Sequence, residues 1–219
     1  MTLIRAGRVR LNAAIRRDPE TPVHLGRDQI EVDGQAVRPA GKLYLMMNKP
    51  RGIVTTASDE KGRQNVYDLL PASLRQKDRW LAPVGRLDKA SEGLLLLTND
   101  SQWAARITDP RSHLDKTYHV QIAALAGDGL LRALANGVSS DGELLRTKRA
   151  TILRQGGRNS WLEIVLDEGK NRHIRRMFEA QRIEVLRLIR VAIGPLSLRD
   201  LVKGATRALT GAEVQQLAV

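Results

Sequence analysis

Hydrophobic and polar residues alternate in several short stretches of the chain, a pattern that predicts β-strands with one buried face. The alternation is clearest over residues 160–167, where Leu162, Ile164 and Leu166 share one face. Residues 43–48 are almost uniformly hydrophobic and lead into Pro50 and Gly52, which predicts a buried strand followed by a turn. The remaining strands are predicted over residues 30–32, 53–56, 116–122 and 149–153.

Helix signals lie between these strands. Ser101 is placed to cap one helix, and Asn171 is placed to cap another that has hydrophobic residues at every third and fourth position. The predicted helices cover residues 3–6, 65–70, 101–108, 127–136, 171–181 and 212–217. Because strands and helices mix without a regular βαβ repeat, the sequence predicts an α+β fold with a mixed, largely antiparallel sheet flanked by helices.

Two domains are expected. Residues 1–38 form a small unit that includes the alternating stretch ending in Asp33 and Gly34, which is typical of a strand and a tight turn. Residues 37–42 resemble a linker, and the larger domain covers 39–219.

Composition narrows the function classes. Lysine and arginine total 36 against 24 acidic residues, so the formal charge of +12 favours a polyanionic partner: RNA, DNA or an anionic membrane. No stretch approaches the roughly 20 apolar residues of a spanning helix, which makes a membrane the weakest choice. The chain has no cysteine and four scattered histidines, so we expect no metal and no cofactor. Phosphate-loop, dinucleotide and zinc-protease motifs are also absent from the sequence.

The most informative stretch is GRLDKASEGLLLLTND, residues 85–100, a charged loop next to an apolar run. Arg86 and Asp88 lie two positions apart, so on an extended backbone both side chains point to one face. A nearby arginine would keep the carboxylate ionised in a dry site. An ordinary surface ion pair between Arg86 and Asp88 is the open alternative.

A second stretch, residues 167–178, is rich in cations. On the predicted helix Arg172, Arg175 and Arg176 share a face opposite the hydrophobic one, with Lys170 and His173 beside them. Such a ridge can bind phosphates, or one arginine can turn inward to pair with a carboxylate. A solvated basic face is the alternative.

The third stretch holds Tyr118 on a predicted strand, in a chain with only three tyrosines. Core packing is the common role of such a residue. The functional interpretation is that its ring stacks on an extruded base and its hydroxyl takes part in proton transfer.

Together, and in this order, GRLDKASEGLLLLTND, DKTYHV, EGKNRHIRRMFEA and LRLIRVAIGPLSL closely resemble the ribosomal pseudouridine synthases of the RsuA-like family. The resemblance spans residue 43 to the C-terminus. It implies a catalytic aspartate at Asp88, a stacking tyrosine at Tyr118 and a basic partner of Asp88 at Arg175. It also implies that Arg86 helps to hold the place of a flipped-out nucleotide.

Further basic residues are expected to contact the RNA. They are Arg8, Lys49, Arg51, Lys89, Lys170, Arg172, His173, Arg176 and Arg190. Residues 1–38 resemble the C-terminal part of the small αL RNA-binding domain, and we expect a reduced form of that domain.

The resemblance thus implies a cytoplasmic, monomeric enzyme that isomerises a specific uridine of ribosomal RNA without metal or cofactor. Large-subunit RNA is the favoured substrate, and Asp88 is expected to attack either the ribose or the base. A catalytically silent RNA-binding or ribosome-assembly protein and a tRNA-directed synthase are the alternatives.

Overall fold

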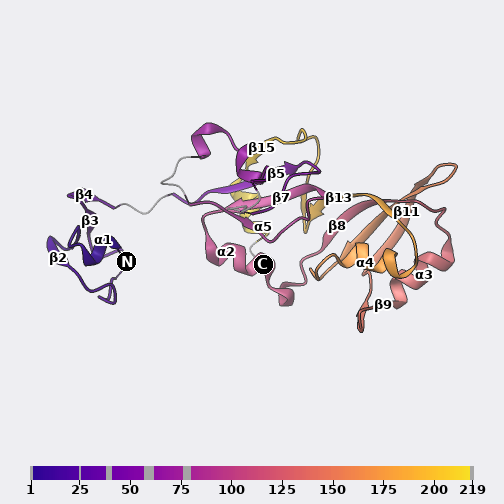
Figure 1. The fold of residues 1–219 in the computed structure, drawn as a ribbon, viewed down its shortest axis with the longest axis horizontal. Helices are drawn as coiled ribbons and strands as arrows, with labels where there is room; N and C mark the ends of the chain where they lie inside the picture. The colour runs from indigo at the N-terminus through magenta and orange to yellow at the C-terminus, as the bar shows by residue number, and fades with distance from the viewer. Residues whose placement is uncertain (1, 25, 38–40, 57–61, 76–79, 218–219) are drawn as a thin grey trace. The chain divides into compact units, whose positions relative to one another are not determined.

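The chain is described by a computed structural model that covers residues 2–24, 26–37, 41–56, 62–75, 80–217. It forms two compact units, Met1–Gly41 and Lys42–Val219, here called the N-terminal unit and the main unit (Figure 1). The predicted boundary between residues 38 and 39 lies outside the described residues.

The N-terminal unit is a small antiparallel sheet with one short helix. Its strands lie in the order β2-β1-β3-β4. Asp33 and Gly34, both at positive φ, form the tight turn that the sequence predicts between the last two strands. Its elements are α1 (Thr2–Arg5), β1 (Val9–Leu11), β2 (Ala14–Arg16), β3 (Ile30–Val32) and β4 (Gln35–Ala36).

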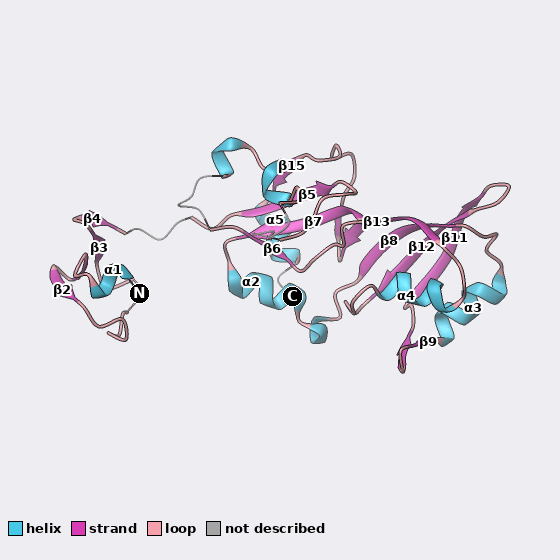
Figure 2. Cartoon of the chain, in the orientation of Figure 1, coloured by secondary structure: helices cyan, strands magenta, loops and turns pink. Residues whose placement is uncertain are grey.

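The main unit is built on one mixed sheet with the strand order β11-β12-β8-β13-β7-β5-β15 (Figure 2). In addition, β6 pairs with β7 and β14 with β13, while β9 and β10 form a separate hairpin. The strands are β5 (Tyr44–Lys49), β6 (Ala82–Val84), β7 (Glu92–Thr98), β8 (Lys116–Ile122), β9 (Val138–Ser140), β10 (Glu143–Leu145), β11 (Arg149–Gln155), β12 (Ser160–Leu166), β13 (Val185–Ile193), β14 (Leu196–Ser197) and β15 (Thr206–Ala208). Every pairing is antiparallel except that of β7 with β13, so the predicted α+β fold is confirmed.

Helices cover the sheet near the predicted positions, with differences at their ends. They are α2 (Ser101–Thr108), α3 (Asp128–Asn136), α4 (His173–Ala180) and α5 (Gly211–Gln216), with the 3-10 turns η1 (Val66–Leu69), η2 (Ala72–Leu74) and η3 (Pro110–Ser112). No helix in the described ranges is long and apolar enough to cross a membrane.

Four local predictions are wrong. Ser101 does not cap α2, because it is the first helical residue and the side chain of Asp100 caps the helix by accepting a hydrogen bond from the backbone nitrogen of Trp103. Asn171 does not cap α4, because Arg172 adopts the left-handed conformation with φ 47° and the helix begins only at His173. Residues 65–70 form a 3-10 turn rather than an α-helix. Residues 53–56 do not form a strand, since Val54 makes only an isolated bridge to Asn65.

Three hydrophobic clusters hold the main unit together. One packs α3 and α4 against β8 and β12, with Leu188 of β13 at its edge. The other two lie on opposite faces of β7, because Leu94 and Leu96 join the cluster around Trp103 while Leu95 and Leu97 join the cluster around Val66. A strand buried on both faces needs no polar alternation, which explains the uninterrupted leucines.

The contact between β7 and β13 is short and close. It consists of the parallel pairs Ile189 with Glu92 and Arg190 with Gly93. Gly93 has φ +103°, and a Cβ atom built on it would lie 2.2 Å from the backbone oxygen of Arg190. Only glycine fits there, so Gly93 allows the two strands to meet.

Candidate active site

A cleft of about 570 Å³ lies over the middle of the main sheet, where β8 and β13 approach the loop between β6 and β7. The start of α4 forms another part of its wall. Its lining includes residues from each of the four motifs that the sequence singles out: Arg86, Asp88, Tyr118, Lys170, Arg172, His173 and Arg190. The fold therefore brings chemistry-bearing residues from distant parts of the chain together.

Asp88 is exposed in the loop between β6 and β7. Its carboxylate makes no hydrogen bond or ion pair with any described residue. The neighbouring Arg86 is also exposed and makes no ion pair with it, so the alternative of a surface ion pair between these two residues is wrong. The carboxylate thus faces the cleft as an unpaired acid.

The backbone around Asp88 is held from below by Lys49. This lysine is fully buried, and its ammonium donates hydrogen bonds to the backbone oxygens of Pro50, Asp88 and Ser91 at 3.1, 3.1 and 2.8 Å. Burial lowers the pKa of Lys49 to about 8, although the charges of Asp88 and Glu92 act in the opposite direction. The expectation that Lys49 contacts RNA is therefore wrong, because its ammonium fixes the turn from Asp88 to Ser91.

Arg175 approaches the same loop from α4. Its guanidinium donates hydrogen bonds to the backbone oxygens of Ala90 at 3.0 Å and Val185 at 3.4 Å. Burial lowers the pKa of Arg175, and the negative charge of Asp88 acts against that shift. The side chains of Asp88 and Arg175 make no direct ion pair in the described part of the chain. Arg175 instead holds the backbone of the loop at Ala90 and supplies positive charge near Asp88.

Tyr118 lies half-buried on β8 and lines the cleft. Part of its ring packs against the cluster under α3 and α4. Across the sheet it lies opposite Arg190 of β13. Core packing and exposure to the cleft are thus combined in one residue, and its role in stacking stays a prediction.

The other basic residues expected to contact RNA divide into two groups. Arg51, Lys89 and Arg172 are exposed, and Arg51 makes one hydrogen bond, to the backbone oxygen of Leu186 at 3.3 Å. His173 and Arg190 are only 3% and 7% exposed, so they do not belong to the outer surface.

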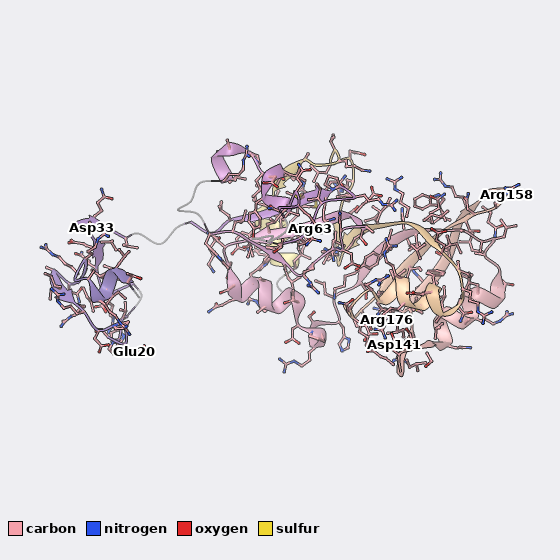
Figure 3. The ribbon with its side chains drawn as sticks, viewed as in Figure 1. Glu20, Asp33, Arg63, Asp141, Arg158 and Arg176 are labelled. Carbon is pink, nitrogen blue, oxygen red and sulfur yellow. The ribbon has the colours of Figure 1, made fainter. Side chains whose placement is uncertain are left out.

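Acidic partners neutralise two cations of the predicted ridge, Arg176 and Lys170. Arg176 pairs with Glu143 at 2.9 Å and with Asp141 at 3.5 Å, and Figure 3 shows Arg176 beside Asp141 at the β9 hairpin. Lys170 lies 3.3 Å from both Glu143 and Glu168. Part of the ridge is therefore an ion-pair network, and the alternative of a simply solvated basic face is wrong for Arg176 and Lys170. In the N-terminal unit, Arg8 pairs with Asp33 in the same way.

Glu92, which sequence reasoning missed, fastens the strands beside the cleft. Its side chain is 3% exposed and accepts hydrogen bonds from Arg187 at 2.7 Å and Lys203 at 2.6 Å. Burial acts to raise the pKa of Glu92, but the hydrogen bonds from these two cations outweigh it and set the pKa to about 2. Its position next to Gly93 in the charged loop was the available signal.

Glu92→Gln is expected to reduce the free energy of unfolding by about 2 kcal/mol at pH 7, because two charge-assisted hydrogen bonds are weakened. The folded-state pKa lies below the unfolded one, so this stabilisation is present above about pH 4.5 and is lost as the pH falls toward 2. Urea denaturation at pH 7 and pH 3 measures it. If the difference in the free energy of unfolding between wild type and variant stayed constant from pH 7 to 3, the stabilisation would not come from the ionised Glu92 carboxylate.

No group of histidine or acidic side chains in the described ranges is arranged to hold a metal ion.

Comparison with known proteins identifies the family. Residues 43–180 match the RNA pseudouridylate synthase family. The chain is 36% identical to ribosomal large subunit pseudouridine synthase B of Bacillus subtilis, over 98% of this chain and 87% of that protein. It is 36% identical to the protein of the same name from Haemophilus influenzae, over 90% of this chain and 56% of that protein.

Known structures agree. A crystal structure of a pseudouridylate synthase superposes with a TM-score of 0.71 and 32% identity, over 99% of this chain and 91% of that one. The archaeal Nop10-Cbf5 complex shares the fold at a TM-score of 0.52 and 16% identity, over 74% of this chain and 52% of that one. The family match covers residues 43–180, and the Bacillus subtilis relative and the pseudouridylate synthase structure match nearly the whole chain. The chain therefore belongs to the RNA pseudouridylate synthase family.

Proposed function

We propose that this protein converts a specific uridine of ribosomal RNA to pseudouridine, with Asp88 as the nucleophile acting on a flipped-out nucleotide. The observation that carries the proposal is the unpaired, exposed carboxylate of Asp88, held in the cleft by backbone contacts to Lys49 and Arg175. The relatives from Bacillus subtilis and Haemophilus influenzae, both named large subunit synthases, support ribosomal RNA as the substrate.

The reaction breaks the bond between ribose C1′ and uracil N1 and rejoins C1′ to C5 of the same ring. A carboxylate suits this task because it can form a covalent bond to the ribose or to the ring and then leave again. A fixed turn keeps that carboxylate at a constant distance from the nucleotide through both steps. The buried contacts of Lys49 provide such a turn.

Access to the uridine requires its extrusion from the RNA stack, at a cost of about a few kcal/mol. Tyr118 offers a ring to the extruded base in the cleft lining, and Arg86 offers a guanidinium there that makes no ion pair with the described residues. Arg51, Lys89 and Arg172 supply exposed positive charge for the flanking phosphates. These residues together support a nucleotide-binding cleft rather than a silent scaffold.

Substrate choice is tested by incubating the protein with unmodified transcripts of large-subunit rRNA, small-subunit rRNA and tRNA. Pseudouridine is then mapped by mass spectrometry. We expect one modified uridine, in large-subunit rRNA. Modification of tRNA alone would favour the tRNA-directed alternative, and no modification of any transcript or of ribosomal assembly intermediates would favour the silent RNA-binding protein.

Affinity for RNA is expected to fall steeply with added salt, because a protein of charge +12 releases counterions when it binds phosphates. Six phosphate contacts would weaken binding by about 10³ between 50 and 200 mM salt. Fluorescence anisotropy with a labelled rRNA fragment measures the dissociation constant across this range. A flat profile would count against any RNA substrate.

A further inference from the structure

Lys116 is an unpartnered cation on the floor of the cleft. It begins β8, is half-buried and lines the cleft two residues before Tyr118. Its ammonium makes no hydrogen bond or ion pair with the part of the chain that the structure describes. Burial lowers the pKa of Lys116, and the positive charge of Arg190 lowers it further, against the weaker effects of Asp167 and Asp115.

Arg190 is a second cation at the same place. It is 7% exposed, its Nε donates a hydrogen bond to the backbone oxygen of Leu94 at 2.7 Å, and its Nη2 has no hydrogen-bond partner. The register of β8 and β13 sets Arg190 opposite Tyr118 and Ile193 opposite Lys116. Lys116 therefore lies two residues from Tyr118 on β8, and Arg190 lies beside Tyr118 on the neighbouring strand β13.

The acids near Lys116 have other partners, apart from Asp88, which lines the same cleft but makes no ion pair with Lys116 among the described residues. Asp115 pairs with Lys148 at 2.8 Å, Asp167 lies 3.8 Å from His113, and Glu168 pairs with Lys170. Two like charges in a partly dry site repel each other and lose hydration, which is costly without a counter-charge. The arrangement points to an anionic group of the ligand.

An RNA nucleotide can offer two anions, a backbone phosphate and a negatively charged base, and the two differ in how deeply they enter the cleft. Phosphates belong to a continuous backbone and stay at the protein surface, where Arg51, Lys89 and Arg172 are exposed. An extruded base instead enters the cleft and meets Tyr118. Because Lys116 and Arg190 flank Tyr118, the base is the group that reaches them.

We propose that Lys116 and Arg190 form an anion site that holds the carbonyl edge of the uracil ring while the ring carries a negative charge. The inference rests on the proposed function. When the C1′–N1 bond breaks with C1′ bonded to Asp88, the electron pair remains on uracil as an anion spread over N1 and the carbonyl oxygens. The C5–C1′ bond then forms as the carboxylate leaves, a proton leaves C5, and a proton is added to N1.

The geometry of the rotation favours such a site. A half-turn about the axis through N3 and C6 exchanges N1 with C5 and O2 with O4. A cation at the carbonyl edge therefore meets an oxygen before and after the rotation, and the same charge stabilises both orientations. Lys116 makes this contact, and Arg190 behind it strengthens the field from a buried position.

The test is Lys116→Met, which keeps the length of the side chain and removes its charge. The single-turnover rate on an rRNA fragment is expected to fall by about 100-fold, with the dissociation constant changed less than about twofold. Lys116→Arg restores the charge and is expected to recover most of the rate. Arg132→Met, which removes one exposed cation outside the cleft lining, is the control and is expected to keep the wild-type rate.

A second substrate separates charge stabilisation from a structural role. Fluorine at C5 withdraws electrons and stabilises the ring anion by itself. On RNA with 5-fluorouridine at the target, the C5–C1′ bond can form as the carboxylate leaves, but C5 has no proton to lose, so the rearranged ring keeps its fluorine and takes up water at C6. The rate of this rearrangement by Lys116→Met is expected to be only about 10-fold lower than by wild type. Circular dichroism and melting curves confirm that the variants are folded.

Equal rate losses on the two substrates, or an unchanged rate, would overturn the anion site. A larger dissociation constant with an unchanged rate would mean that Lys116 binds a phosphate, and this result would overturn the anion site as well. Inactive wild-type protein would instead remove the proposed function itself, so the two failures are distinguishable.

Discussion

Replacing Asp88 by asparagine is expected to abolish pseudouridine formation while the fold and the RNA affinity are retained. Asparagine has nearly the same size but cannot act as a carboxylate nucleophile, so the single-turnover rate should fall by about 10⁴ or more. Because the Asp88 side chain is exposed and has no partner among the described residues, the substitution breaks no stabilising contact.

Asp200→Asn is the matched control for this experiment. Asp200 is exposed and lies outside the cleft lining, so the same chemical change should leave the rate at the wild-type value. Release of the C5 proton from tritiated RNA gives the rate, and anisotropy gives the affinity. Continued turnover by the Asp88→Asn protein would show that another group performs the chemistry.

Gly93→Ala is expected to have the largest effect on stability. The added Cβ would lie 2.2 Å from the oxygen and 2.8 Å from the nitrogen of the Arg190 backbone, and φ is +103°. Neither strand can yield without losing the parallel pairing of β7 and β13. We expect a loss of more than about 4 kcal/mol in the free energy of unfolding, or a failure to fold.

A second glycine isolates the cause. Gly142 has φ +76° at the tip of the β9 hairpin, but a Cβ atom there meets nothing within 4 Å. Gly142→Ala therefore pays only the conformational cost of about 1 kcal/mol. Urea denaturation of both variants compares the clash with the backbone strain, and similar losses for the two would remove the close approach at Gly93 as the explanation.

Local patterns predicted the helices and the strands β5, β8, β11 and β12, but they missed β7 and β13 at the centre of the main sheet. Alternation over β12 identified its buried face, since Leu162, Ile164 and Leu166 are all in the core. The strand β7 was harder to assign, because its leucines are buried on both faces and show no period. The position of β7 in the sheet depends on its pairing with β5, β6 and β13, which the sequence pattern does not show.

The site likewise contains residues that short motifs predict and residues that depend on long-range contacts. Asp88, Arg86 and Tyr118 stand out in short motifs, and the fold places all three at one cleft. The burial of Lys49 could not be predicted, because the carbonyl oxygens that compensate its charge lie about 40 positions away in the chain. Lys116 was within reach of sequence reasoning, since residues two apart on a strand share a face.

The two sides of the cleft are carried by different strands of the sheet. The carboxylate of Asp88 precedes β7, whereas Tyr118 lies on β8 beyond β13. Gly93 allows β7 to approach β13 closely, so a residue without a side chain contributes to the distance between the Asp88 loop and Tyr118. The geometry of the cleft therefore depends on backbone packing beneath it as well as on the side chains that line it.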